Sequence, residues 1–368
     1  MQSSDPATKD LAEPFFLKAA ELDSTLAEAH VGLGAVHVDR YFRGAEGLRT
    51  GLEAADSRFR TALRIRPGFL RAVRGLINLS YEQGRCEVAL QQAKANSAGR
   101  PDDVESQMTR AWAYALSGLP EKSVPILDRI ITLEPRNSEA VWLGTFSRCW
   151  AGRYAESLAS GKAYVRAFGE EPEMYTWMAI AADGLQRDEE AAAYFERALE
   201  LFSDEESNMY SAFLAVSFYT RIGKPDRAQA IARHWIPLLQ GRLEIAPDNL
   251  RAQCTLLGLL GALGMTAEVQ QTTDELLDRL RNQSAMGGQA LMFAVSASAN
   301  VGDLARVRKL LGETGSRDLA SFQQLLLPDW SRHVLTRPEN EAALEAMPEY
   351  RSFVAAVRAR VAELGARY

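Results

Sequence analysis

Apolar residues recur along much of the chain at spacings of three and four, the pattern of a helix with one buried face. A triplet of alanine, phenylalanine and alanine shows this most clearly. It occurs three times, at Ala12/Phe16/Ala19, Ala55/Phe59/Ala62 and Ala191/Phe195/Ala198. Runs of valine and isoleucine between turn residues, which would indicate strands, are missing from the sequence. The pattern therefore predicts an all-α chain.

The helical pattern is periodic over longer distances. Pro67, Pro101 and Pro135 are each 34 residues apart, and Gly169 continues the series. Proline just past a helix stops it sharply, because its ring cannot continue the hydrogen-bond ladder. Glycines stand midway between such stops, where paired helices would reverse, at Gly84, Gly118, Gly152, Gly223, Gly264 and Gly302. A repeated helix–turn–helix unit follows from this spacing.

With its 34-residue helix pairs, small residues at fixed positions and a proline near the end, this unit resembles the tetratricopeptide repeat (TPR) family. The resemblance implies a right-handed superhelical solenoid of antiparallel helix pairs. A lone helix is expected at 7–22 and a weaker hairpin at 287–311. Between them we expect seven units, starting at Ala27, Leu70, Val104, Ser138, Pro172, Glu206 and Leu250. The array would occupy residues 1–315.

Two units depart from the period. The first contains about nine extra residues around Tyr41–Ala54, and the unit at Glu206 has a second helix extended through Gly241. Insertions in a solenoid usually map to one face, often the binding face. The alternative is that they only change the local curvature.

Residues 316–368 break the period and are expected to form C-terminal capping helices, at Ser316–Leu327 and Ala342–Leu364. A solenoid needs a polar outer face at its end. We expect three arginines to face solvent while three apolar residues dock on the array. These are Arg351, Arg358 and Arg360, and Phe353, Val354 and Val357.

Composition, charge and cysteine spacing argue against several functional classes. A net charge of −6 argues against a nucleic-acid surface, and no apolar run is long enough to span a membrane. The polar start has no signal-peptide core, and Cys86, Cys149 and Cys254 are too far apart for a zinc motif. We expect a cytoplasmic protein. Of the 42 basic residues 35 are arginine, which fits a GC-rich bacterial genome, and the array resembles TPR regions of bacterial signalling proteins.

Sequence motifs for catalysis are missing. His30 and His37 are seven residues apart, too far for a metal pair on one helix, and there is neither a phosphate loop nor a nucleophile elbow. Gly32 and Gly34 lie inside an expected helix rather than after a strand. We therefore expect no enzyme activity, no cofactor and no metal.

In TPR arrays, the resemblance implies that the second, fifth, ninth and twelfth positions of each unit point into a concave groove. The apolar candidates at these positions are Trp112, Trp142, Phe146, Cys149, Ile180, Tyr210 and Leu214. Exposed apolar side chains in a concavity mark binding sites. A helical stripe such as Trp142, Phe146 and Trp150 is, however, equally typical of a core, so the sequence leaves both interpretations open.

Polar groove candidates come from the same positions. Glutamate recurs at Glu105, Glu139 and Glu173, which could form an acidic ladder or simply complement helix dipoles. Arg74 and Asn78 match the first pair of a carboxylate-binding clamp known in the family, but Glu139 at a later position would repel a carboxylate. We expect no such clamp.

These features favour a non-catalytic scaffold or regulatory module that binds a peptide or helix of a partner protein. An amphipathic segment with basic residues along one flank would match the apolar anchors and the glutamates. A second hypothesis is a sensor that encloses a small peptide or metabolite. An enzyme of unrecognised type is the third.

Overall fold

The structure is a computed structural model that describes residues 6–42, 44–98, 100, 102–201, 209–281, 288–314, 318–326 and 333–368. The elements in chain order are α1 (Pro6–Leu22), α2 (Ala27–Phe42), a π-helix η1 (Leu48–Glu53), α3 (Ala54–Ile65), α4 (Leu70–Glu82), α5 (Cys86–Ser97), α6 (Val104–Leu116), α7 (Pro120–Leu133), α8 (Ser138–Trp150), α9 (Tyr154–Phe168), α10 (Pro172–Gly184), α11 (Asp188–Leu201), α12 (Met209–Arg221), α13 (Pro225–Ile245), α14 (Leu250–Leu263), α15 (Thr266–Arg281), α16 (Gly288–Asn300), α17 (Leu304–Gly312), a 3-10 helix η2 (Leu319–Leu326), α19 (Pro338–Ala346) and α20 (Pro348–Arg367).

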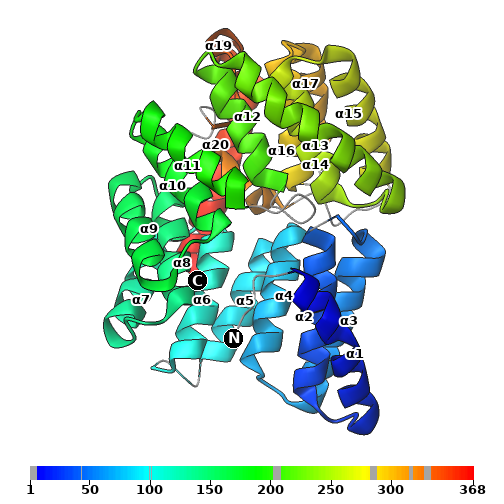
Figure 1. Cartoon of the computed structure of the whole chain (residues 1–368), viewed down its shortest axis with the longest axis vertical. Helices are drawn as coiled ribbons and strands as arrows, with labels where there is room; N and C mark the ends of the chain where they lie inside the picture. The colour runs from blue at the N-terminus through cyan, green and yellow to red at the C-terminus, as the bar shows by residue number, and fades with distance from the viewer. Residues whose placement is uncertain are drawn as a thin grey trace.

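The chain is a solenoid of antiparallel helix pairs, as Figure 1 shows, and the described ranges contain no strand. The right-handed helical solenoid expected from the sequence is confirmed. The expected first residues of six units coincide with the first residues of α2, α4, α6, α8, α10 and α14. Glu206, Gly287 and Pro101 lie outside the described residues. The extended helix α13 runs beyond Gly241 to Ile245.

The repeated residues have clear packing roles. Phe59 is buried against Gly34 of α2 and Gly75 of α4, where a side chain on either glycine would collide with its ring. Ala62 and Ala198 are fully buried, as the spacing predicts. Gly84 turns the chain between α4 and α5 with a φ of 69°, a conformation that glycine adopts without strain.

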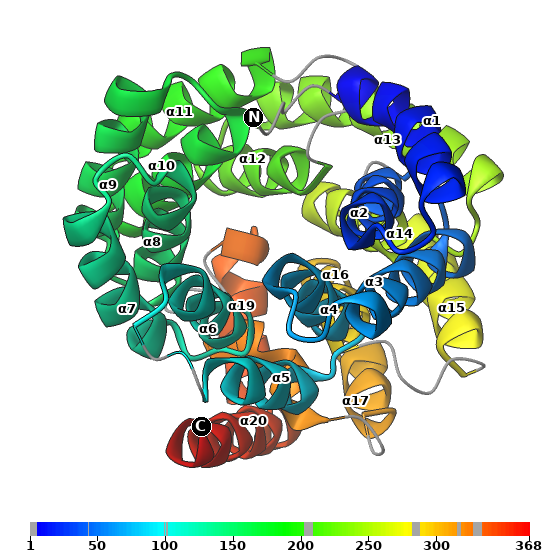
Figure 2. The same cartoon turned by 90° about the horizontal axis from the view of Figure 1, so that it is seen from below.

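Seen along the other axis in Figure 2, the helix pairs curve into a ring. The first helix of each pair lies on the inside, and the second helices form the outer layer. In this view α14 overlaps α2, and Figure 1 shows α14 above α2 and α3 along the long axis, so the far end of the array comes to lie over its beginning. Hydrogen bonds close the ring there: Asn249 Nδ2 donates to the carbonyl oxygens of Tyr41 at 2.8 Å and Glu46 at 2.6 Å.

The insertion at Tyr41–Ala54 therefore forms part of this closure. Arg251 at the start of α14 lies over the ring of Phe42, 4.6 Å from its centroid, and its Nη1 is 3.5 Å from Glu82 Oε1. Both contacts join residues about 170 to 210 positions apart. The extra residues thus do more than alter curvature, because they supply the surface on which the far end of the array docks.

The C-terminal segment packs on α16 and α17, at the end of the array, and continues to α5 and α6. Phe353 and Val357 are buried as expected. Arg351 and Arg358 are exposed as expected, but Arg360 is not a free solvent-facing side chain. It pairs with Glu87 of α5 at 2.7 Å and with Asp318 at 3.1 Å, because α20 extends past the end of the array and lies beside α5 at the outer edge in Figure 2.

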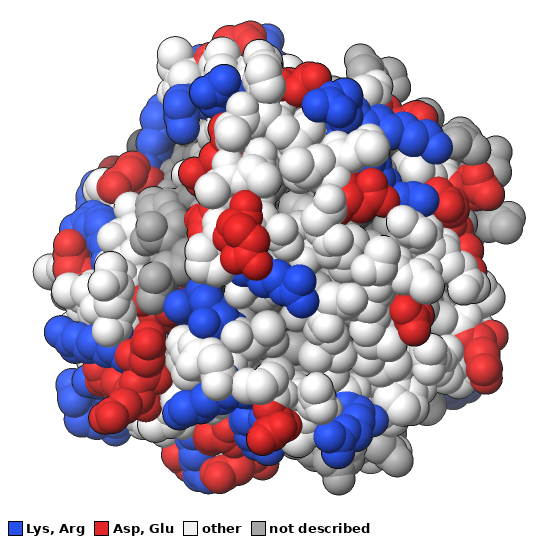
Figure 3. All heavy atoms as spheres, turned by 90° about the horizontal axis from the view of Figure 1, so that it is seen from above, with Lys and Arg blue, Asp and Glu red and all other residues white. Residues whose placement is uncertain are grey.

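The surface has no single charged stripe on the face shown in Figure 3. Basic and acidic side chains alternate there between broad uncharged areas. None of the described helices combines the length with the apolar character required to cross a bilayer.

Candidate functional site

Aromatic side chains gather on the inner helices α6, α8 and α10. The rings of Trp112 and Trp142 stack at 5.8 Å, and Trp142 in turn stacks on Phe146 at 5.9 Å. Trp150 and Trp177 complete the cluster around Phe146, with ring centroids at 4.5 and 4.9 Å. The sequence left open whether this stripe is groove or core. In the structure the stripe is partly groove and partly core. Trp112 and Trp142 are half-buried, whereas Phe146, Trp150 and Trp177 are buried.

A polar group adjoins this stack. Glu139 Oε1 accepts hydrogen bonds from Trp112 Nε1 at 3.0 Å and from Arg74 Nη1 at 2.5 Å. Three consecutive inner helices, α4, α6 and α8, are joined by this one carboxylate. The buried Nε1 atoms of Trp142 and Trp177 have no hydrogen-bond partner among the described residues. A buried indole N–H without an acceptor costs free energy.

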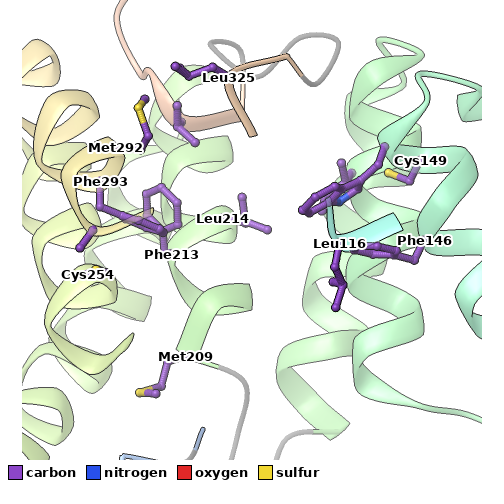
Figure 4. Close-up of a cluster of buried hydrophobic side chains, with 14 of the residues drawn as sticks. Leu116, Phe146, Cys149, Met209, Phe213, Leu214, Cys254, Met292, Phe293 and Leu325 are labelled. Carbon is purple, nitrogen blue, oxygen red and sulfur yellow. The ribbon is translucent and has the colours of Figure 1, made fainter. Parts of the chain in front are cut away.

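The opposite wall comes from α12, α14 and α16. In Figure 4, Leu214 of α12 points across the interior of the ring toward Phe146 and Cys149 of α8, whereas Phe213 points to Phe293 of α16. Tyr210, one turn before Leu214, is half-buried and packs edge-on against Phe293 at 6.3 Å. Burial raises the pKa of Tyr210, consistent with a phenol deep inside the ring. Residues separated by some 65 positions in the sequence thus line one space.

The remaining candidates are distributed differently. Ile180 and Leu214 are buried, and Asn78 is half-buried on α4. Glu105 is exposed and Glu173 half-buried. These residues lie on inner helices.

The three glutamates do not form a uniform acidic ladder. Glu139 is neutralised by Arg74, whereas Glu105 is open to solvent. A fourth glutamate at the same repeat position, Glu28, pairs with Arg66 at 2.7 Å. The negative charge of the inner wall is therefore largely compensated by the chain's own arginines.

Sequence reasoning did not select two other inner-wall residues, Tyr81 and Arg251, and it mapped Asp183 to the groove without making it a site candidate. All three occupy the same repeat positions as the chosen candidates: Tyr81 and Asp183 are twelfth in their units, and Arg251 is second. Asp183 is buried, and its carboxylate accepts from Arg221 Nη2 at 2.5 Å and lies 3.0 Å from His333 Nδ1. The positional rule, which gave Asp183, would also have found Tyr81 and Arg251 had it been applied to every unit.

Burial shifts the pKa of several titratable groups in and near the wall. Cys149 and Cys254 are buried, and burial raises the pKa of each thiol to about 12, so neither is a thiolate at neutral pH. Burial also raises the pKa of Glu82. Within the described ranges, histidine, cysteine, aspartate and glutamate side chains form no group of three that could hold a metal.

Comparisons with known proteins agree with the architecture. Residues 172–205 match the tetratricopeptide repeat family model. No curated protein matches the chain. Among solved structures, the chain is similar to a thermophilic TPR protein from Thermus thermophilus, at 22% identity over 47% of this chain and 90% of that chain, with a TM-score of 0.40. It is also similar to PilF of Pseudomonas aeruginosa, at 17% identity over 61% and 96%, with a TM-score of 0.41.

A third similar structure is YrrB, described as a TPR protein with an unusual peptide-binding site. It is 15% identical over 50% of this chain and 91% of that chain, with a TM-score of 0.32. The family match covers α10 and α11, and the same helix pair recurs before and after them. Residues 172–205 thus match one tetratricopeptide repeat, and the rest of the chain resembles TPR proteins in its repeated helix pairs.

Proposed function

We propose that this chain is a non-catalytic interaction module that holds a peptide segment of a partner protein on the inner face of its ring. By inner face we mean the half-buried side chains Arg74, Tyr81, Trp112, Trp142 and Tyr210. TPR arrays generally act as protein-interaction scaffolds, and this fold suggests the same role here. The observation that carries the proposal is the stack of Trp112 on Trp142, because large aromatic rings that are only partly buried are the usual anchors of an interface.

The inner face also suggests what the ligand looks like. Apolar or aromatic side chains of a partner would contact the stacked indoles, and its backbone or polar side chains would meet Arg74 and Tyr210. A lysine or arginine on the ligand could pair with the exposed Glu105. At Glu139 it would have to displace Arg74. A basic flank would therefore add less affinity than the acidic ladder alone suggests.

Closure of the ring favours a second candidate. Because Asn249 ties α14 to the insertion after α2, the inner face is surrounded by helices rather than open along one side. A small peptide or metabolite sensor would use such an enclosure, and ligand binding would then change the closure itself. The two candidates differ in the size of the ligand that the ring retains.

The test is capture of a partner from a lysate by the full chain, followed by titration of the recovered protein. Replacing Trp142 with alanine should weaken binding about tenfold or more, since a central aromatic anchor is lost. Phe15 of α1 provides the matched control, because it is an exposed aromatic residue outside the ring. If Phe15→Ala weakens binding and a folded Trp142→Ala does not, the binding site lies on the outer surface and the proposal is wrong.

A further inference from the structure

The C-terminal segment lies against the inner face that we propose as the binding surface. Gln324 of η2 donates from Nε2 to the hydroxyl oxygen of Tyr81 at 3.1 Å. Its neighbour Gln323 donates to the backbone carbonyl of Leu116, the last residue of α6, at 2.9 Å. Leu325 lies in the buried cluster beside Met292 (Figure 4). A short segment of the chain thus makes the contacts expected of a bound peptide.

The contacts of η2 suit both the hydrogen-bonding groups and the shape of the wall. The last carbonyl groups of a helix have no partner within the helix, so the end of α6 offers free acceptors. A glutamine carboxamide satisfies one of them. Gln323 is buried, and its Cβ and Cγ lie where a side chain on Gly118 would collide, so the segment is closely packed on the wall. Phe322, also buried, packs edge-on against Phe353 of α20 at 4.9 Å.

Helix α20 holds this segment in place through side chains that reach α5 and α6. Glu87 of α5 accepts from Arg360 at 2.7 Å and from Arg367 at 2.5 Å. Tyr114 of α6 donates its hydroxyl to the carbonyl oxygen of Tyr368 at 2.7 Å. We call Glu87, Arg360 and Arg367 the latch. Its ion pairs are partly exposed, and such pairs contribute little individually, so a modest competing interaction is enough to release them.

From these contacts we infer that η2 is a built-in competitor for the inner face. In the closed ring it covers Tyr81 of that face and the adjoining end of α6. A partner segment with glutamine side chains next to leucine or phenylalanine, the chemistry of η2 itself, replaces it. The inference rests on the proposed function, since it takes the inner face to be the binding surface, and it adds both the ligand chemistry and the regulation of access.

The experiment uses a fluorescent synthetic peptide of residues 318–326 and the full chain, with binding followed by anisotropy. In the wild type the chain's own η2 competes, so the peptide should bind weakly. The variant Gln323→Ala/Gln324→Ala loses two hydrogen bonds of the internal competitor and keeps the wall intact. Its dissociation constant for the peptide should be about tenfold lower. Gln271→Ala, an exposed glutamine on α15, is the control and should match the wild type.

The latch gives a second, milder variant if the double variant does not fold. Arg360→Gln removes the bond to Glu87 and should also tighten peptide binding. Equal affinity of the wild type and both folded variants would overturn the inference, as would equal binding of a peptide with both glutamines changed to alanine. Capture of the partner distinguishes failure of the competitor role of η2 from failure of the proposed binding function. Capture that needs Trp142 but is unchanged in the glutamine variant refutes the competitor and leaves the proposed function standing.

Discussion

Phe59 and the two glycines beside it provide a quantitative test of the repeat packing. A Cβ on Gly75 of α4 would lie 2.5 Å from two carbons of the Phe59 ring. A Cβ on Gly34 of α2 would lie 2.6 Å from another carbon of the same ring. Carbon atoms normally approach to about 3.5–4.0 Å. The ring would therefore have to move by about 1 Å, although it is also packed against Gly34 of α2.

We expect Gly75→Ala to be destabilised by this collision. Overpacking of this kind costs about 1–3 kcal/mol, and alanine regains about 1 kcal/mol through its higher helix propensity. Gly241→Ala is the matched control, because it lies inside α13 and nothing is within 4 Å of its built Cβ. It should be stabilised by about 1 kcal/mol. The difference between the two variants isolates the collision at about 1–3 kcal/mol.

Urea unfolding followed by circular dichroism would measure the two free energies of unfolding. A double variant, Gly75→Ala/Phe59→Leu, should show coupling between the two sites, since the smaller side chain relieves the collision that the alanine creates. Equal stability of Gly75→Ala and Gly241→Ala would refute the reasoning and place Phe59 elsewhere.

Three further outcomes are expected. Replacing Ala198, which is fully buried, with leucine should cost about 1–3 kcal/mol and lower the thermal midpoint; an unchanged midpoint would show that no tight contact exists there. Phe146→Ala should destabilise the fold by about 3–5 kcal/mol in thermal or urea unfolding, because the ring is buried among tryptophans. The Arg360 guanidinium lowers the pKa of Glu87, so this carboxylate stabilises the fold fully above the ordinary glutamate value and loses that effect as the pH falls through the lowered pKa. The stability gap between the wild type and Glu87→Gln should therefore close in acid, and a gap that widens there would contradict the assignment.

The repeat itself was predictable because each unit carries local signals. Proline stops, turn glycines and the alanine–phenylalanine–alanine triplet depend on contacts within one helix pair or between neighbours. The start of α4 at Leu70 and of α10 at Pro172 could thus be predicted to the residue. The boundary between array and cap at residue 315 remains a prediction.

Closure of the ring could not be predicted from these local signals. It depends on the small rotation that each pair adds to the last, and on hydrogen bonds between Asn249 and residues more than 200 positions away. The ion pair of Arg360 could not be predicted either. From the sequence this residue is a solvent-facing helix position, but in the fold it pairs with Glu87 of α5. The candidate site was partly predictable. The repeat position placed Trp142 on an inner helix, but the packing of three neighbouring aromatic rings decides how much of it is exposed.

The most direct measurement is hydrogen–deuterium exchange of the full chain, alone and with the partner protein recovered by capture. Binding at the inner face with replacement of the internal competitor predicts slower exchange in α6, α8 and α12, together with faster exchange in η2 and α20. Slower exchange confined to the outer helices, with η2 and α20 unchanged, would contradict both the site and its regulation.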